Sequence, residues 1–411
     1  MARLVLPIIF GAAFTVATCA AIGSLLLARM CLPLRRRESI LMAFVAGAAC
    51  LSLAIFGLCV VHQARPGVFL AGGAAAIAGA TWKAAGQSSP RPPLGRFPST
   101  WIVLFFLILA SFSIIYLFNS VAPEVSPDGS GYHLGNVHRY WNAHGFDWRH
   151  RSLYSSMPQG LEMLFLMAYS FGGNCAAALV HSAFLLALPL VVAAFGARIG
   201  SPRAGLFAGL LAFTSPVAGI AGVSAYNDLA VATVLFAEFY LLQVWDDDRA
   251  TNYLILIGLL SGFAVSIKYT AALVIPFAAA FVWWRSRSYR HVFRVLAAAA
   301  IAVVPWVVRN WIWTGNPLAP FLNRWFPNPF FHPGAEQRYL ADLHHYQAVG
   351  SLWEILVQLA FRGGKIPGIV GPVFLLAPLA LLALRHRHGR RLLLAAVVFG
   401  LPVCSTWMPG S

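Results

Sequence analysis

Residues 101–118 read WIVLFFLILASFSIIYLF, an apolar run without a single charged side chain. A helix of about 20 apolar residues crosses the hydrocarbon core of a bilayer. Because lipid offers no water to satisfy backbone groups, such a run must be helical. The whole chain of 411 residues is similar, with 59% hydrophobic and 10% charged residues, against roughly 25% charged in soluble domains. This composition excludes a water-soluble fold, a disordered chain and a coiled coil.

Further apolar runs on both sides of this stretch predict about twelve transmembrane helices in an all-α polytopic membrane protein. The expected spans are 4–28, 39–61, 67–83, 101–118, 175–197, 204–222, 227–245, 252–267, 270–284, 294–312, 366–384 and 391–408.

The net charge of +16 is distributed unevenly between the predicted loops. Of the 29 Lys and Arg residues, 18 fall on one side of the predicted bilayer. Cytoplasmic loops of membrane proteins are enriched in Lys and Arg, so this side is predicted to be the cytoplasm, with both termini outside. The same enrichment explains the positive charge, and no motif indicates a nucleic-acid partner.

Two long loops, 119–174 and 313–365, fall on the predicted outer side. In the first, Leu134, Val137, His138 and Trp141 follow a helical spacing, which predicts a short interfacial helix with one apolar face. A second short helix is expected over 158–171, also at the interface. The four histidines of this loop are five or six residues apart, so no two share a helical face and no metal site is predicted.

Asp128 lies between the end of span 101–118 and this first interfacial helix. A carboxylate at a helix N-terminus is favoured by the helix dipole and can cap the helix. The alternative is a general base held at the membrane surface.

Other polar residues lie at predicted membrane edges. Asp228 opens span 227–245, either as a helix cap or as a functional acid. Lys268 and Arg309 lie at outer span ends, where long cations reach the interface. Arg309 is alternatively a ligand for an anionic lipid headgroup, and Arg362 could help it.

Two further acidic features lie elsewhere. Glu238 lies within a span, as a structural acid or part of an ion path. Residues 246–248 read DDD, which we interpret as a solvated turn at a helix end rather than as a nucleotide-sugar motif.

Five stretches in order over about 101–323 resemble the GT-C superfamily of membrane glycosyltransferases, which includes protein O-mannosyltransferases and lipid A aminoarabinose transferases. They are Pro127-Asp128 with Tyr132-His133-Leu134, Met157-Pro158-Gln159-Gly160-Leu161-Glu162, Ser224-Ala225-Tyr226-Asn227-Asp228, Gly258-Leu259-Leu260-Ser261-Gly262 leading to Ile267-Lys268-Tyr269-Thr270, and Pro305-Trp306-Val307-Val308-Arg309-Asn310-Trp311 through Gly315-Asn316-Pro317-Leu318.

The resemblance implies a GT-C-like helical bundle over 101–411, preceded by three N-terminal helices within 1–100, with a C-terminus shorter than in many relatives. It also implies a polyprenyl-phosphate-linked sugar as donor, a lipid, glycan or protein acceptor, and an active site on the outer face of the membrane. The sequence shows no eukaryotic-style retention signal or long hydrophilic tail, which favours a bacterial inner membrane. Asp128 matches the catalytic acid of the family. Some relatives carry an Asp-Glu pair there, whereas this chain has Asp128-Gly129, so a second acid is expected from Asp228 or Glu162.

The expected mechanism is inverting. Asp128 takes the proton of an acceptor hydroxyl, and Arg309 with Lys268 or Arg362 stabilises the departing lipid phosphate. Tyr132, His133 and Glu162 complete the predicted substrate site. No cofactor is predicted, although a divalent metal stays open. The alternatives are a transporter or lipid flippase, a glycan polymerase or ligase of cell-envelope biosynthesis, and a non-catalytic scaffold.

Overall fold

The computed structural model describes residues 2–85, 99–347, 349, 351–365 and 368–405. Within these ranges the chain is helical and contains no β-strand. Six helices are long and apolar enough to cross a membrane, and a bent pair adds a seventh if it counts as one span. The protein is therefore a multi-pass membrane protein. The six helices are α1 (Ala2–Met30), α2 (Arg36–Val60), α4 (Ser99–Val121), α7 (Gly160–Arg198), α10 (Asp228–Asp248) and α13 (Tyr289–Thr314).

The prediction of about twelve spans is not confirmed. Helices α3 (Pro66–Ala85), α11 (Asn252–Ile267) and α12 (Val274–Ser286) form where spans are expected, but they do not meet the length and apolarity of a full span. The expected span 204–222 is broken into α8 (Pro202–Thr214) and α9 (Pro216–Val223), which meet at an angle of 62°. Pro216 at the start of α9 cannot donate the backbone hydrogen bond that would continue α8.

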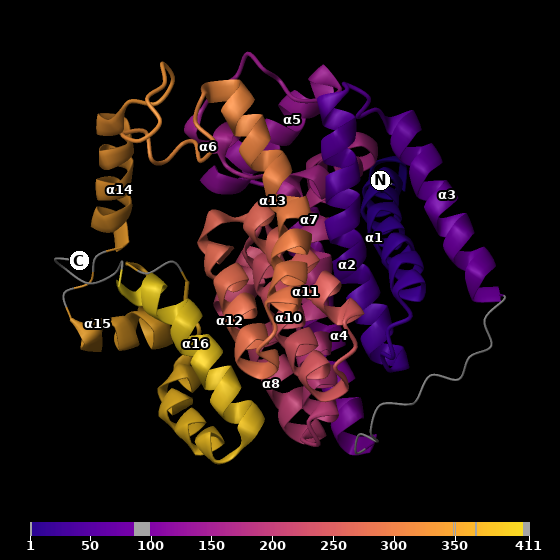
Figure 1. Cartoon of the computed structure of the whole chain (residues 1–411), viewed down its shortest axis with the longest axis vertical. Helices are drawn as coiled ribbons and strands as arrows, with labels where there is room; N and C mark the ends of the chain where they lie inside the picture. Colours follow the sequence, from indigo (N-terminus) through magenta and orange to yellow (C-terminus); the bar gives the residue numbers. More distant parts are fainter. Residues whose placement is uncertain (1, 86–98, 348, 350, 366–367, 406–411) are drawn as a thin grey trace.

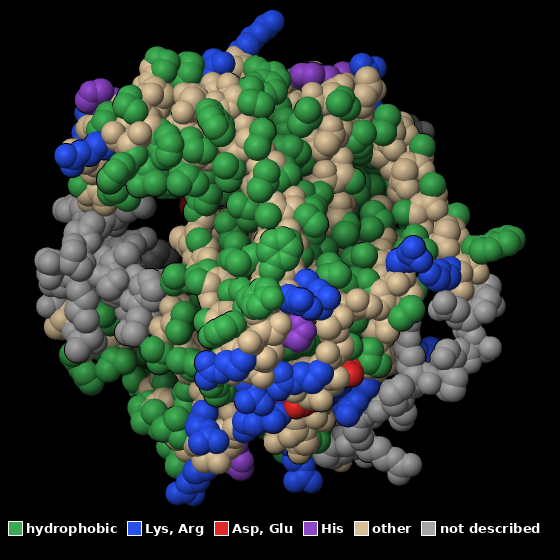
Figure 2. Space-filling model, in the orientation of Figure 1, with side chains coloured by type: hydrophobic (Ala, Val, Ile, Leu, Met, Phe, Trp, Pro, Cys, Tyr) green, Lys and Arg blue, Asp and Glu red, His purple; other side chains and the backbone are tan. Residues whose placement is uncertain are grey.

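The bundle has two ends (Figure 1), and they carry different side chains. One end, which we call the loop end, carries η1 (Gly129–His133), α5 (Leu134–Ala143) and α6 (Leu153–Ser156). There His62, in the α2–α3 turn, lies with its Nδ1 3.0 Å from the carbonyl oxygen of Ala143. The opposite end, which we call the basic end, brings Arg198 into a 3.0 Å ion pair with Glu38. Figure 2 shows Lys and Arg side chains gathered toward this end, with apolar side chains above them.

Helix α7 consists of two segments that change direction at Gly173, whose φ of 65° and ψ of −155° suit glycine almost alone. The first segment, over 160–172, corresponds to the short helix predicted over 158–171, and the second corresponds to the predicted span 175–197. The interfacial location of the first segment stays a prediction. Its residues Leu161 to Ala168 are buried in the main hydrophobic core, which also contains residues of α2, α10 and α11.

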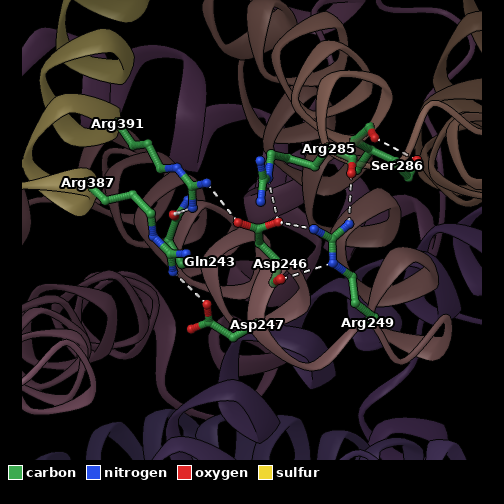
Figure 3. Close-up of polar contacts among 9 residues, drawn as sticks. Gln243, Asp246, Asp247, Arg249, Arg285, Ser286, Arg387 and Arg391 are labelled. Atoms are coloured by element: carbon green, nitrogen blue, oxygen red, sulfur yellow. Dashed lines mark hydrogen bonds and ion pairs between the residues drawn. The ribbon is translucent and has the colours of Figure 1, made fainter.

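The C-terminal part contains α14 (Pro333–Gln347), α15 (Leu352–Val357), η3 (Gln358–Arg362), η4 (Pro372–Arg385) and α16 (Arg387–Ser405). The expected spans 366–384 and 391–408 overlap η4 and α16, and residues 366–367 and 406–408 lie outside the described residues. The end of α10 holds α16 through ion pairs at Asp246 and Asp247 (Figure 3). The interpretation of 246–248 as a solvated turn is wrong for Asp246, whose side chain is fully buried.

Candidate functional site

The loop end brings together six of the eight predicted site residues. The segment that carries Asp128 is fixed by Glu124, an acid that the sequence interpretation did not single out. One Glu124 oxygen accepts hydrogen bonds from the Ser126 backbone N–H at 2.9 Å and from the Ser126 hydroxyl at 2.5 Å. The other accepts from the backbone N–H of Ala225 at 2.8 Å. This carboxylate therefore joins the Asp128 segment to the turn that precedes α10.

Gly129 leaves the space that the Glu124 carboxyl fills. A Cβ at position 129 would lie 2.6 Å from Glu124 Cδ, which is closer than packed atoms approach. A second acid directly after Asp128 would therefore displace Glu124.

Asp128 itself is exposed and does not cap the helix that follows. Its backbone is already helical and its carboxylate makes no capping hydrogen bond. Ser126 supplies that contact, because its hydroxyl oxygen accepts the Gly129 backbone N–H at 3.1 Å. The interpretation of Asp128 as a helix cap is thus wrong, and within the described ranges its carboxylate has no ion-pair or hydrogen-bond partner.

Tyr132 connects the three predicted acids of the site. Its ring stacks on that of Tyr154, with centroids 4.2 Å apart and planes inclined by 7°. Burial raises the pKa of Tyr132, and the negative charges of Asp128, Glu162 and Asp228 raise it further. The charges of all three carboxylates therefore act on this one side chain.

The charge of Asp128 also acts on three more tyrosines. Burial raises the pKa of Tyr154, Tyr226 and Tyr339, and in each case the charge of Asp128 adds to the effect. Tyr339 comes from α14, in the second long loop, and its ring lies 6.4 Å from that of Tyr154. The two predicted outer loops therefore meet at this cluster of acids and tyrosines, which we call the acid–tyrosine cluster.

Glu162 lies on the inner side of the cluster, where it and His133 are both buried. The His133 Nδ1 atom lies 2.5 Å from one Glu162 oxygen, and the other oxygen has no partner within the ranges that the structure describes. A buried carboxylate oxygen without a partner is costly, so it marks a position where a donor group would be favoured.

Asp228 and Lys268 form a half-exposed ion pair with a separation of 2.6 Å. The N-cap residue of α10 is Asn227, so Asp228 is the first helical residue and its carboxylate faces Lys268. The preceding turn is held by buried His181, which hydrogen-bonds the Ser224 carbonyl through Nδ1 and accepts the Leu229 N–H at Nε2. His181 is a second residue that the sequence interpretation missed.

Arg309 makes no ion pair in the part of the chain that the structure describes. Its guanidinium is buried and donates to the carbonyl oxygens of Ser155 at 3.0 Å and Met157 at 3.2 Å. The rings of Phe146, Trp306 and Trp313 enclose it, with centroids 4.6 to 5.4 Å from Cζ. This arrangement fixes the α6–α7 connection.

Arg362 ends η3 and is exposed, and none of the cluster residues contacts it. Lys365 nearby pairs with Glu354 at 2.7 Å. Within the described residues no group of three or more His, Cys, Asp or Glu side chains is placed to hold a metal ion.

A cavity of about 610 Å³ opens beside the last turn of α5, lined by His62, Arg139, Asn142, Ala143, Phe146, Asp147, Trp148 and Arg149. None of the eight predicted site residues lines it. The cavity and the acid–tyrosine cluster are thus separate features of the loop end.

These features define a multi-pass helical membrane protein with an acid–tyrosine cluster at one end. A family model described as a domain of unknown function (DUF8201) matches residues 164–349. Searches of curated proteins and of solved structures found no match. The matched range includes Asp228, Lys268 and Arg309, and it starts after Asp128 and Glu162.

Proposed function

We propose that the protein is a membrane glycosyltransferase, in which the acid–tyrosine cluster moves a sugar from a polyprenyl-phosphate donor to an acceptor hydroxyl. The observation that carries the proposal is the exposed carboxylate of Asp128, which has no partner in the described chain and lies four residues before Tyr132 in a linked set of tyrosine rings. A base must be free to accept a proton, and aromatic rings provide flat apolar faces for a sugar.

In the proposed reaction the acceptor oxygen attacks the anomeric carbon and its proton passes to Asp128. The new carbon–oxygen bond forms as the bond between the anomeric carbon and the phosphate oxygen breaks, and the electron pair stays on the lipid phosphate. A single displacement inverts the configuration at the sugar. The isoprenoid tail of the donor lies in lipid beside the bundle. Because the leaving group is a lipid phosphate and not a nucleotide, no nucleotide site is needed.

Lys268 is the cation assigned to the departing phosphate. It already lies beside the acids, 2.6 Å from Asp228, and its side chain is 39% exposed. We assign Arg309 a positioning role instead, because its guanidinium is engaged with the carbonyl groups of Ser155 and Met157. Glu162, with one free buried oxygen, is assigned to accept a hydrogen bond from a sugar hydroxyl.

We also propose that the loop end faces away from the cytoplasm, in the inner membrane of a bacterium. The support is the distribution of charge, because Lys and Arg gather at the opposite end (Figure 2). A lipid-linked donor does not depend on nucleotide sugars from the cytoplasm, so it can serve an acid–tyrosine cluster on the outer face.

The decisive experiment is a transfer assay in membranes, with a panel of polyprenyl-phosphate sugars and mixed acceptors. Asp128→Asn is expected to abolish transfer without changing the amount of protein in the membrane. Asp342→Asn, an exposed acid of α14, is the matched control and should keep full activity. Full activity in Asp128→Asn would remove the base, and no transfer by the wild type with any donor would remove the proposed function.

A transporter is the second candidate, and Glu238 is the observation that favours it. This residue is buried in the middle of α10, and among the described residues neither of its carboxylate oxygens has a partner. Ionisable residues at membrane depth often mark ion or proton paths. Substrate flux into vesicles that is lost in Glu238→Gln and kept in Asp128→Asn would favour transport over transfer.

A further inference from the structure

A membrane-facing groove lies between α12 and α13 at the basic end, and it is independent of the proposed function. The two helices pack side by side (Figure 1). The groove has a volume of about 520 Å³ and is apolar on both walls. Its lining includes Ala279, Ala280 and Trp283 from α12 and Val292, Phe293 and Leu296 from α13.

The shape of the groove follows from the sizes of these side chains. Ala279 and Ala280 leave a hollow on α12, while Trp283 and Phe293 project beside it and are 45% and 70% exposed. Tyr289 closes the end nearest the α12–α13 turn and is 71% exposed. Large apolar side chains are this exposed only where lipid or a partner covers them, and aromatic residues prefer the level of the lipid headgroups.

Three arginines stand at the aromatic end of the groove. Arg287 lies in the α12–α13 turn, and Arg290 and Arg294 follow four residues apart on α13, which places them on one face of the helix. All three are exposed, and in the described part of the chain none of them pairs with a carboxylate.

Four other arginines at this end differ from Arg287, Arg290 and Arg294, because they form ion pairs with carboxylates. Four guanidinium groups surround Asp246 and Asp247 in the ion pairs of Figure 3, and they belong to Arg249, Arg285, Arg387 and Arg391. Arg287, Arg290 and Arg294 thus provide three uncompensated positive charges beside the apolar groove, whereas the four paired arginines do not.

We propose that the groove binds an anionic phospholipid, with one acyl chain between α12 and α13 and the phosphate against Arg287, Arg290 and Arg294. The apolar walls exclude a polar ligand, while the guanidinium fork matches phosphate oxygens. A zwitterionic lipid would bring its own cation to the same arginines, so the charge favours an acidic headgroup such as phosphatidylglycerol. Basic clusters at the cytoplasmic leaflet recognise anionic lipids in this way.

The expected effect of each arginine follows from its position near the membrane surface. One Lys or Arg near an anionic surface contributes about 1 kcal/mol, which corresponds to roughly a fivefold change in affinity. Replacing two of them should weaken binding of the anionic lipid roughly 25-fold.

The test uses the full chain in phosphatidylcholine nanodiscs, with brominated phosphatidylglycerol added as a quencher of tryptophan fluorescence. The signal of Trp283 is obtained by subtracting that of Trp283→Phe. Arg290→Gln/Arg294→Gln should require roughly 25 times more of the anionic lipid for half-maximal quenching. The matched control is Arg385→Gln/Arg390→Gln, which removes two exposed arginines away from the groove and should behave as the wild type.

A second pair of variants tests the acyl chain separately from the charge. Ala280→Leu fills the groove and should reduce quenching, while Ala297→Leu, at an exposed position outside the lining, should not. Equal quenching by brominated phosphatidylcholine and phosphatidylglycerol would overturn the proposal, as would equal effects of the variants and their controls. Circular dichroism spectra that match the wild type confirm that each variant is folded.

Discussion

Two neighbouring aspartates at the end of α10 provide a direct test of how burial sets the strength of an ion pair. Asp246 has a fully buried side chain and accepts hydrogen bonds from Arg249 and Arg285 at 2.6 Å and from Arg391 at 2.7 Å. Asp247 is 43% exposed and pairs with Arg387 at 2.6 Å. The same change to Asn at either position removes one negative charge.

The expected magnitudes differ because the arginines left behind differ. Asp246→Asn leaves Arg391, only 7% exposed, without its carboxylate. Removing one partner of a buried ion pair costs about 3–5 kcal/mol, because the other charge stays buried and uncompensated. Asp247→Asn leaves Arg387, which is 47% exposed and can be hydrated. An exposed pair contributes about 0–1 kcal/mol, so this second loss should be small.

The assay follows unfolding in detergent with a dye that fluoresces on reaction with thiols. Cys19 and Cys59 are buried and report the loss of the main core. We expect a clear loss of stability in Asp246→Asn and nearly none in Asp247→Asn. Faster trypsin cleavage near Arg387 in Asp246→Asn alone would show that α16 has detached. Equal, small losses in the two variants would refute the reasoning that burial controls the contribution of this cluster.

Three further changes test single features. Arg309→Lys should destabilise the α6–α7 connection by about 1.5–3 kcal/mol, because an ammonium cannot reproduce the fork to two carbonyl groups, and faster proteolysis at Arg151 would report it. Gly173→Ala should cost about 1–3 kcal/mol because its φ of 65° and ψ of −155° are strained for any side chain; Gly57→Ala, in open space within α2, is the control and should cost nothing. Glu238→Leu should preserve or increase thermal stability, since it removes a buried carboxyl without partners; a marked loss would show that the acid has a structural partner.

Much of the fold could be predicted from hydropathy, because lipid forces an apolar run to be helical. The runs 4–28, 39–61, 101–118, 227–245 and 294–312 correspond to five of the long helices. Hydropathy counts apolar residues but does not detect where an apolar run bends. The break at Ser215 depends on backbone geometry inside apolar sequence, so the bend within the predicted span 204–222 was missed. The kink at Gly173, in contrast, falls between the helix predicted over 158–171 and the predicted span 175–197.

The candidate site could be predicted where its residues lie close together in the sequence. Asp128, Tyr132 and His133 lie within six residues, and their grouping follows from the short helix that contains them. Glu124 and His181 were missed because their partners are distant backbone groups that no local pattern reveals. A single histidine within an apolar span was the one available signal for His181.

The two cations predicted to bind phosphate show why a sequence alone could not rank them. Each lies near the outer end of a span, and in sequence they look alike. Lys268 is half-exposed and paired with a half-exposed Asp228, so exchanging that carboxylate for a phosphate costs about 0–1 kcal/mol. Arg309 would have to give up hydrogen bonds to two carbonyl groups inside an aromatic enclosure, at about 1.5–3 kcal/mol for each bond. If the proposed function holds, the lipid phosphate should bind Lys268 rather than Arg309, and Lys268→Gln should weaken donor use far more than it weakens folding.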